Sequence, residues 1–123
     1  MKKVSTDKAP KAIGPYSQAI ISNNLLFISG QIPINPNTGT IEKDDIESQA
    51  RQCFINIKGI LNEVNLDFNN VIKTTVFLKD IKDFNIFNQI YDEYFISKPA
   101  RSLVEVSNLP KNAKIEIEVI AEV

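Results

Sequence analysis

The sequence lacks histidine and tryptophan altogether, and it has a single cysteine, Cys53. A chain without histidine and with one thiol cannot build the imidazole and thiolate clusters that hold zinc or blue copper, and it cannot close an internal disulfide. Any acid or base that takes part in a reaction must therefore be a carboxylate, a lysine, a tyrosine or that one thiol.

An excess of charge of either sign is also missing. Fourteen Lys and Arg residues face fifteen Asp and Glu residues, which leaves a net charge of -1. We therefore expect no general affinity for nucleic acids or for anionic membranes. There are only four glycines, and they form no phosphate-binding motif.

Long apolar runs are absent too. The longest, such as residues 25–28, fall far below the roughly 20 residues of a membrane-spanning helix, and residues 1–8 lack the apolar core of a secretory signal. We therefore expect a soluble cytoplasmic protein. With 123 residues, of which 43% are hydrophobic, residues 1–123 have the size and composition of one domain with a substantial core.

What the sequence does contain is an alternation of strands and helices. Apolar residues spaced by three and four predict a helix over residues 44–64, with Asp44 as its N-cap and Glu47 completing a capping box. A second helix is predicted to begin at Asp83 and to stop before Pro99. The predicted strands cover 17–22, 25–29, 71–78, 102–107 and 114–123, while residues 1–16 and 30–43 are interpreted as an arm and a loop.

The order of these elements predicts an α+β fold in which the helices pack on one face of a sheet. Asn23-Asn24 indicates a hairpin turn between the first two strands. Residues 25–28 and 76–78 are apolar at odd-numbered and even-numbered positions alike, so both faces of these strands are apolar. We therefore expect these strands to be covered on both faces. Two helices cannot supply that cover, and we infer an oligomer whose sheets pack on one another.

Four residues could carry chemistry or have an ordinary structural place. Strict alternation puts Glu116 and Glu118 on one face of the last strand, either as solvated charges or as an acid or base beside a pocket, and spacing does not separate the two. Arg101, at the entry of a strand, is either a surface cation or a bidentate clamp for a substrate carboxylate. Cys53 falls on the apolar stripe of the first helix, which predicts a buried, inert thiol.

Other positions give weaker signals. Ser29-Gly30 could expose a hydroxyl and a free N–H beside a loop, but the pair is also an ordinary turn. Tyr16 and Asn88 are polar groups without diagnostic spacing. Arg51 lies in the middle of the first helix, where we expect that a lysine would serve equally well.

Several segments, taken together, resemble one protein family. They read AIGPYSQA at 12–19, FISGQIP at 27–33, VIKTTVFL at 71–78, PARSLVEV at 99–106, LPK at 109–111 and IEIE at 115–118. In this order, over essentially the whole chain, they resemble the Rid family of reactive intermediate or imine deaminases, which is YjgF-like and is also called the L-PSP endoribonuclease family. Arg101 in the PxRS motif is typical of the deaminase subgroup.

The resemblance implies a chorismate-mutase-like fold, a mixed sheet of about five or six strands with two helices on one face. It also implies a homotrimer with a barrel-like centre and with ligand clefts between the subunits. The implied activity, without metal or cofactor, is hydrolysis of 2-iminobutanoate and 2-iminopropanoate to 2-keto acids and ammonia. These imines arise from enamines that pyridoxal-phosphate-dependent dehydratases release.

The resemblance assigns roles to seven residues. Arg101 would hold the substrate carboxylate, and Glu116 would orient the water or move its proton. The cleft would be lined by Tyr16, Ser29, Gly30, Asn88 and the backbone of Leu103. Leu103 stands where many relatives have cysteine, so activity requires that this position act through its backbone, and the segment 95–99 looks one residue short. Two other functions stay open from the sequence, namely a ribonuclease or translation inhibitor and a non-catalytic binder of small acids.

Overall fold

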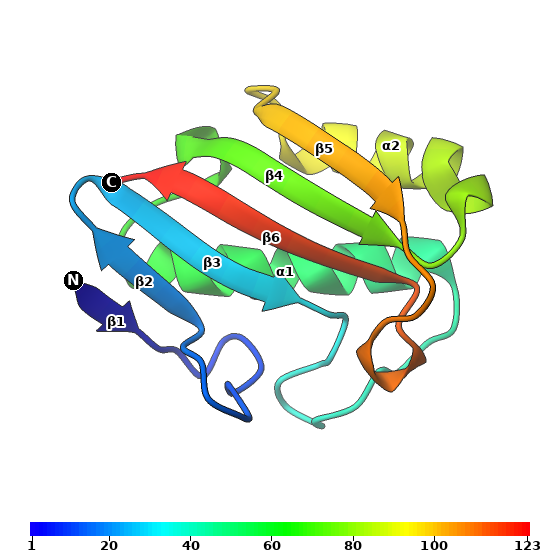
Figure 1. Ribbon diagram of the computed structural model, residues 1–123, viewed down its shortest axis with the longest axis horizontal. Coiled ribbons are helices and arrows are strands. Elements are labelled where there is room, and N and C mark those ends of the chain that lie inside the picture. The colour runs from blue at the N-terminus through cyan, green and yellow to red at the C-terminus, as the bar shows by residue number, and fades with distance from the viewer.

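The computed structural model describes residues 1–123 as one mixed sheet with both helices on the same face (Figure 1). The strands are β1 Lys2–Val4, β2 Ala19–Ser22, β3 Leu25–Gln31, β4 Val71–Leu78, β5 Ala100–Glu105 and β6 Ile115–Glu122. The helices are α1 Ile46–Glu63 and α2 Phe84–Tyr94, and short 3-10 turns cover Phe68–Asn70, Ile81–Asp83 and Pro110–Asn112.

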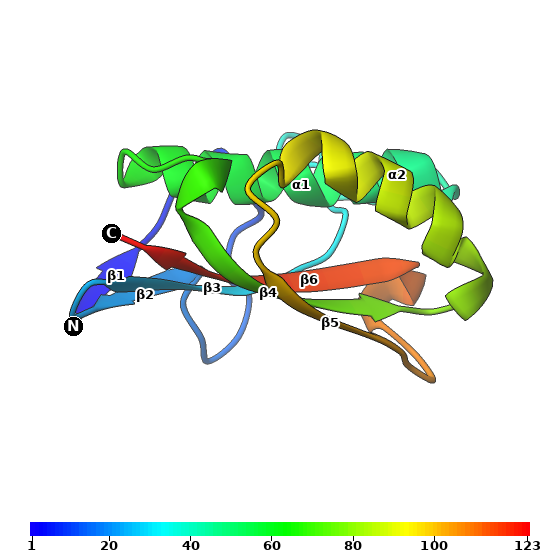
Figure 2. The same cartoon turned by 90° about the horizontal axis from the view of Figure 1, so that it is seen from above.

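The sheet has the strand order β1-β2-β3-β6-β4-β5. Only β4 and β5 run parallel, and every other neighbouring pair is antiparallel. Helix α1 connects β3 to β4, and α2 connects β4 to β5, so both crossovers return to the same side of the sheet. Figure 2 shows this two-layer arrangement, which confirms the predicted α+β fold.

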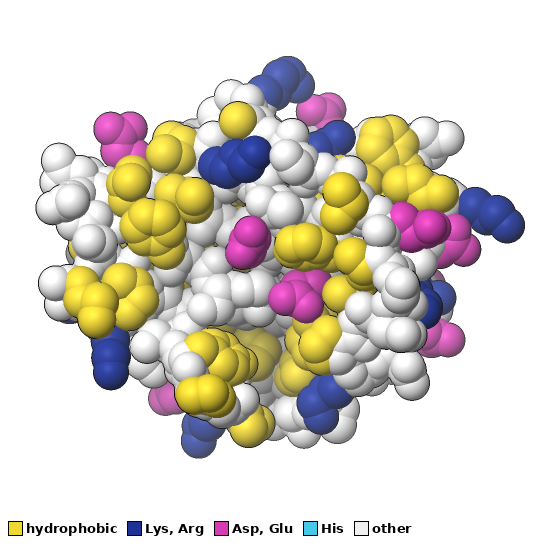
Figure 3. Space-filling view, in the orientation of Figure 1, with side chains coloured by type: hydrophobic (Ala, Val, Ile, Leu, Met, Phe, Trp, Pro, Cys, Tyr) yellow, Lys and Arg dark blue, Asp and Glu magenta, His cyan; other side chains and the backbone are white.

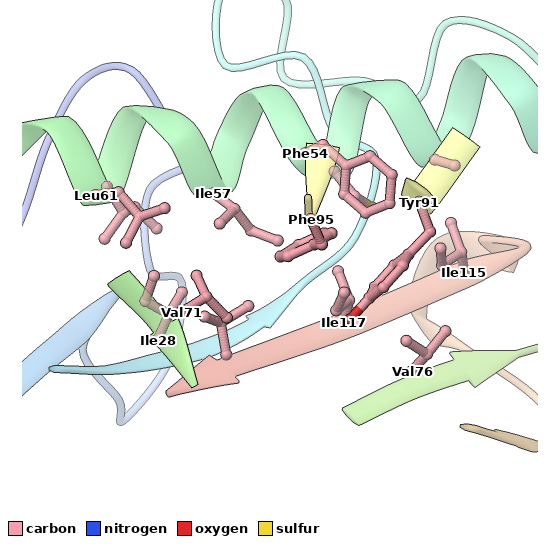
Figure 4. Close-up of a cluster of buried hydrophobic side chains, with 14 of the residues drawn as sticks. Ile28, Phe54, Ile57, Leu61, Val71, Val76, Tyr91, Phe95, Ile115 and Ile117 are labelled. Carbon is pink, nitrogen blue, oxygen red and sulfur yellow. The ribbon is translucent and has the colours of Figure 1, made fainter. Parts of the chain in front are cut away.

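The core lies between the helices and the sheet. Burial alternates along β6, where Ile115, Ile117, Val119 and Ala121 face the helices as the pattern predicted. Figure 4 shows side chains from both helices pointing toward the sheet, where Ile115 and Ile117 of β6 lie. The core also contains Cys53, which is completely buried and whose thiol donates a hydrogen bond of 3.3 Å to the carbonyl of Gln31. Burial, and secondarily the negative charge of Glu116, raises the pKa of this thiol, in keeping with an inert role.

The structure corrects the predicted bounds of two strands, because β3 extends through Gln31 and β5 covers Ala100–Glu105 instead of 102–107. It also corrects two other details of the predicted elements. Residues 2–4, interpreted as part of an arm, form the edge strand β1, which pairs with β2. The N-cap of α1 is Asp45 and not Asp44, because the Asp45 carboxylate accepts a hydrogen bond of 2.8 Å from the backbone N–H of Ser48. Two consecutive aspartates offered two possible caps, and the second one matches the start of the helix. The third helical residue is then Ser48, so Glu47 does not complete the predicted capping box.

Arg51 has a role that the sequence did not indicate. Its guanidinium lies 3.2 Å from the Glu47 carboxylate one turn earlier on α1 and 2.9 Å from the Glu93 carboxylate on α2. It also donates a hydrogen bond of 3.4 Å to the hydroxyl of Tyr94. Arg51 uses three nitrogens for these contacts whereas a lysine has one, so this geometry argues against the expectation that lysine would serve equally well.

The other face of the sheet has no helix on it. Leu26 and Ile28 point toward the helices, whereas Phe27 between them is 41% exposed on the open face. Phe77 of β4 is partly covered on that same face. Figure 3 shows this side of the molecule, with acidic side chains near its middle and apolar side chains around them. Neither helix is long and apolar enough to cross a membrane.

Candidate active site

Arg101 lies on the edge strand β5 and meets helix α2. Its Nη1 donates a hydrogen bond of 2.8 Å to Oδ1 of Asn88, and its guanidinium carbon lies 4.8 Å from the centre of the Tyr91 ring. None of the four ion pairs of the chain includes Arg101, so this half-buried cation has no carboxylate partner. It lines a cavity of about 560 Å³ together with Asn88, Tyr91 and Lys98. A fixed, unpaired guanidinium in a cavity suits an anionic ligand.

The segment 95–99 forms a wall of this cavity. A hydrogen bond of 3.0 Å from the backbone N–H of Lys98 to the carbonyl of Phe95 closes the turn after α2. Lys98 has a φ of 55°, which is uncommon for a residue with a side chain. Its ammonium pairs with Asp92 at 3.1 Å. The tight connection therefore brings Arg101, two residues after the turn, up against the end of α2.

Glu116 lies on β6 and points to the open face of the sheet. Its carboxyl group rests on the backbone of Gly30, because a β-carbon at residue 30 would lie 2.9 Å from Cδ of Glu116. Burial raises the pKa of Glu116, and the negative charge of Glu118 raises it further. A carboxylate with a raised pKa accepts a proton more readily near neutral pH, as a general base must.

Ser29 and Gly30 sit at an irregularity in β3. The register between β3 and β6 shifts between Ile28 and Gln31, which is the signature of a β-bulge. The Ser29 hydroxyl donates its proton to the carbonyl of Ser17 at 2.6 Å, so its oxygen can only accept a hydrogen bond from a ligand. The bulge thus turns a hydroxyl oxygen and a bare backbone segment toward the carboxyl group of Glu116.

The cavity around Glu116 has a volume of about 710 Å³, and Tyr16, Ser29 and Gly30 line it. Tyr16 is 54% exposed at its rim. Two buried amide side chains hold the walls. Gln18 binds the backbone of Thr6, Ala9 and Pro10, which fixes the segment before Tyr16. Asn56 of α1 donates hydrogen bonds of 3.3 and 2.9 Å to the carbonyls of Ile32 and Ile34.

Arg101 and Glu116 point to opposite faces of the sheet. Paired residues on neighbouring strands share a face, and Arg101 pairs with Thr74, which is buried beneath α2. Glu116 pairs with Phe77, three residues further along β4, on the open face. The two backbone positions are about 10 Å apart along the strands and about 10 Å apart across them. One small ligand therefore cannot touch both side chains of the same chain.

The seven residues named from the sequence thus separate into two groups and an outlier. Tyr16, Ser29, Gly30 and Glu116 share one cavity, and Arg101 and Asn88 share the other. Leu103 lines neither cavity, and its side chain packs against the hydrophobic core, so the predicted backbone contact with a ligand stays a prediction. No group of three or more carboxylate and thiol side chains is close enough to hold a metal ion.

Sequence reasoning missed the residues that support these groups. Gln18 and Asn56 are 4% and 0% exposed, and their position among apolar neighbours in the sequence was the signal that could have found them. Tyr91, in the predicted second helix, was not singled out. Its spacing from Asn88, three residues away, could have indicated that both face the same group.

Comparison with known proteins supplies a family. The family model described as "Endoribonuclease L-PSP" matches residues 6–123. The chain is 59% identical over 123 residues to a RutC family protein of Pyrococcus horikoshii, with 98% of each chain covered. It is 48% identical to the human protein named 2-iminobutanoate/2-iminopropanoate deaminase, covering 96% of this chain and 87% of that one. The crystal structure of Escherichia coli TdcF with bound serine superposes with a TM-score of 0.95 at 42% identity, covering 100% of this chain and 99% of that one.

Proposed function

Because the chain belongs to the endoribonuclease L-PSP family, we propose that it is a deaminase that hydrolyses small 2-imino acids to 2-keto acids and ammonia. The observation that carries this proposal is the pair of charged groups in the two cavities. Arg101 offers an unpaired guanidinium fork, and Glu116 offers a carboxylate whose pKa burial has raised. A 2-imino acid needs both, since it carries a carboxylate next to an electrophilic carbon that water must attack.

Two relatives support this choice of substrate. The human relative is named for 2-iminobutanoate and 2-iminopropanoate, and the Escherichia coli structure holds serine. Serine has the same arrangement of a carboxylate beside a carbon that bears nitrogen. 2-Iminobutanoate and 2-iminopropanoate are therefore the substrates that we expect for this chain.

The reaction needs few groups. Arg101 binds the substrate carboxylate through two N–H groups, which places C2 of the protonated imine. Water adds to C2 as Glu116 takes its proton, and a tetrahedral carbinolamine forms. Glu116 returns that proton to the nitrogen, the C–N bond breaks, and ammonia departs as the C=O bond forms. The hydroxyl proton passes to Glu116 and from there to ammonia, which is released as ammonium. Water and the iminium thus give a 2-keto acid and an ammonium ion, with no change in oxidation state.

We further propose that each site forms between two copies of the chain, in a homotrimer. The opposite orientation of Arg101 and Glu116 supports this, because a neighbouring subunit can bring its Arg101 to the open face that carries Glu116. The exposed Phe27 on that face also supports association. Light scattering is expected to give a particle near three times 13.8 kDa. A stable, active monomer would contradict the proposal.

Turnover is tested with an imine substrate that a dehydratase generates in the assay. The protein is added to threonine and a threonine dehydratase in the presence of semicarbazide, which traps imine, and a deaminase lowers the yield of trapped product. Arg101→Lys is the matched control. RNA is incubated with the protein in parallel. Binding of 2-ketobutyrate without any acceleration would overturn the hydrolase proposal in favour of a non-catalytic binder, and cleavage of RNA alone would favour a ribonuclease.

The shared site has its own test, which uses co-expressed Arg101→Lys and Glu116→Gln chains. If each site takes one residue from each of two subunits, random mixing restores about one quarter of the sites to full activity, although each variant alone is strongly impaired. If both residues act within one chain, mixing restores none.

A further inference from the structure

A stripe of residues on one side of α2 holds Arg101. Phe84, Asn88 and Tyr91 are separated by four and then three residues, the spacing of neighbours on a helix surface. The ring centres of Phe84 and Tyr91 lie 5.9 and 4.8 Å from the guanidinium carbon, and Asn88 accepts the hydrogen bond of 2.8 Å. The proposed reaction gives neither aromatic ring a role.

Tyr91 is the nearer ring, and it is itself fixed. Its hydroxyl shares a hydrogen bond of 2.8 Å with the hydroxyl of Thr74, the residue that pairs with Arg101 across β4 and β5. Its ring stacks on Phe95 with the ring centres 4.3 Å apart. Figure 4 shows Tyr91 reaching from α2 toward the sheet. Burial raises the pKa of Tyr91, so the phenol stays neutral. Its contact with Arg101 is therefore a cation–π interaction.

We propose that Tyr91 is a positioning residue, which holds the Arg101 guanidinium in the orientation that a substrate carboxylate requires. A long side chain that must be ordered on binding lowers affinity, because its lost conformational freedom opposes association. With Asn88 on Nη1 and the Tyr91 ring beneath it, the guanidinium is ordered beforehand and its other N–H groups keep a fixed direction. The inference rests on the proposed function, in which Arg101 binds the carboxylate.

The first test is spectroscopic and does not depend on activity. The chain has two arginines, Arg51 and Arg101, so the side-chain NH resonances can be assigned with one substitution, Arg101→Lys. In the wild-type protein the Arg101 guanidinium protons are expected upfield of those of Arg51, because they lie over an aromatic ring. The shift is expected to persist in Tyr91→Phe and to shrink in Tyr91→Leu. An unshifted Arg101 in the wild-type protein would overturn the proposal without any variant.

The second test is a split between KM and kcat in the intact protein. Tyr91→Leu is expected to raise KM for the imine and Kd for 2-ketobutyrate about 3- to 30-fold, the range that a cation–ring contact spans. The value of kcat should change little, since the clamp binds ground state and transition state alike. Tyr91→Phe keeps the ring and is expected to recover most of the lost affinity.

Phe87→Leu is the matched control. Phe87 is fully buried and packs on Phe54 and Tyr91 with ring centres 6.1 and 5.5 Å away, but it has no ring contact with Arg101. It should lower the melting temperature and leave KM unchanged. Equal rises of KM in Phe87→Leu and Tyr91→Leu would mean loss of packing and would overturn the proposal. A wild-type protein that neither binds 2-ketobutyrate nor hydrolyses imines would overturn the proposed function and the predicted change in KM with it, while the NMR shift still reports where Arg101 lies.

Discussion

The carboxyl group of Glu116 rests against the backbone of Gly30 on the adjoining strand. A β-carbon at residue 30 would lie 2.9 Å from Cδ of Glu116, which is closer than non-bonded contacts of real β-carbons come. Residue 30 must therefore be glycine for Glu116 to keep its place. The β-bulge of β3 places residue 30 beside Glu116, and the lack of a side chain at Gly30 leaves room for the carboxyl group.

Gly30→Ala is expected to displace the Glu116 carboxyl group and to lower turnover on the order of 10²-fold, the scale of a lost general base. The backbone at Gly30 does not have a positive φ, so the effect should come from the clash and not from strain. The same substitution in a Glu116→Gln background should cost little more, because the base is already gone. Additive losses in steady-state kinetics would contradict this account.

Arg101→Lys is expected to raise KM for the imine roughly 10- to 100-fold, the equivalent of a lost hydrogen bond to a charged group. The guanidinium can donate two parallel hydrogen bonds to a carboxylate while its Nη1 also donates one to Asn88. An ammonium is a point charge and cannot reproduce this geometry. Arg51→Lys is the control, because Arg51 joins α1 to α2 and lines neither cavity. It should lower the melting temperature slightly and leave KM unchanged. Wild-type kinetics in Arg101→Lys would favour the alternative interpretation that Arg101 is only a surface cation.

The strongly patterned elements could be predicted from the sequence. Helix α1 and strand β4 combine length with a clear period, and the structure places both where the pattern did. Strand β1 was missed because three residues, Lys2–Val4, carry no period and form a strand only through pairing with β2. The N-cap was displaced by one residue because Asp44 and Asp45 are equally good caps in isolation.

The site was harder to read than the fold. Motifs identified Arg101 and Glu116 as partners, but β5 has no clean alternation, so nothing in its sequence told which face Arg101 takes. That face follows from the register of β5 against β4, a long-range pairing. The contact of Glu116 with Gly30 likewise depends on a register shift. Local periodicity contains neither piece of information.

Cys53→Ala is expected to keep full turnover and to lower the free energy of unfolding by about 1 kcal/mol, the typical cost of a small core deletion. The thiol is completely buried and its pKa is raised, so it is no nucleophile. Denaturant unfolding and the coupled assay measure the two quantities. Loss of turnover on thiol alkylation, with circular dichroism unchanged, would count against this view.

The dependence of activity on pH should follow the ionisation of Glu116. Because burial raises its pKa, the deprotonated base is lost, and kcat/KM falls, at a higher pH than for an exposed glutamate. Glu118 contributes to that shift through its negative charge. Glu118→Gln is therefore expected to move the acid limb of the pH profile to lower pH. A limb that stays in place would mean that Glu116 does not control it.

The last prediction separates the two glutamates of β6 by activity and stability together. Glu116→Gln should lower turnover on the order of 10²-fold or more and leave the Kd for 2-ketobutyrate near its wild-type value, because Arg101 still binds the carboxylate. Glu118→Gln should do much less, since Glu118 is exposed whereas Glu116 rests on Gly30.

The Glu116→Gln substitution should raise the thermal stability of the protein at neutral pH although it lowers activity. A carboxyl group whose pKa is raised by folding binds its proton more tightly in the native state, so stability falls as the pH rises from the unfolded pKa through the folded one. Above that window the ionised Glu116 destabilises the fold, and Glu116→Gln should raise the melting temperature at neutral pH while it removes activity. Thermal unfolding at several pH values measures this. A Glu118→Gln variant that is inactive and more stable, beside an unaffected Glu116→Gln, would assign the base to the other carboxylate, and two fully active variants would remove the carboxylate from the mechanism.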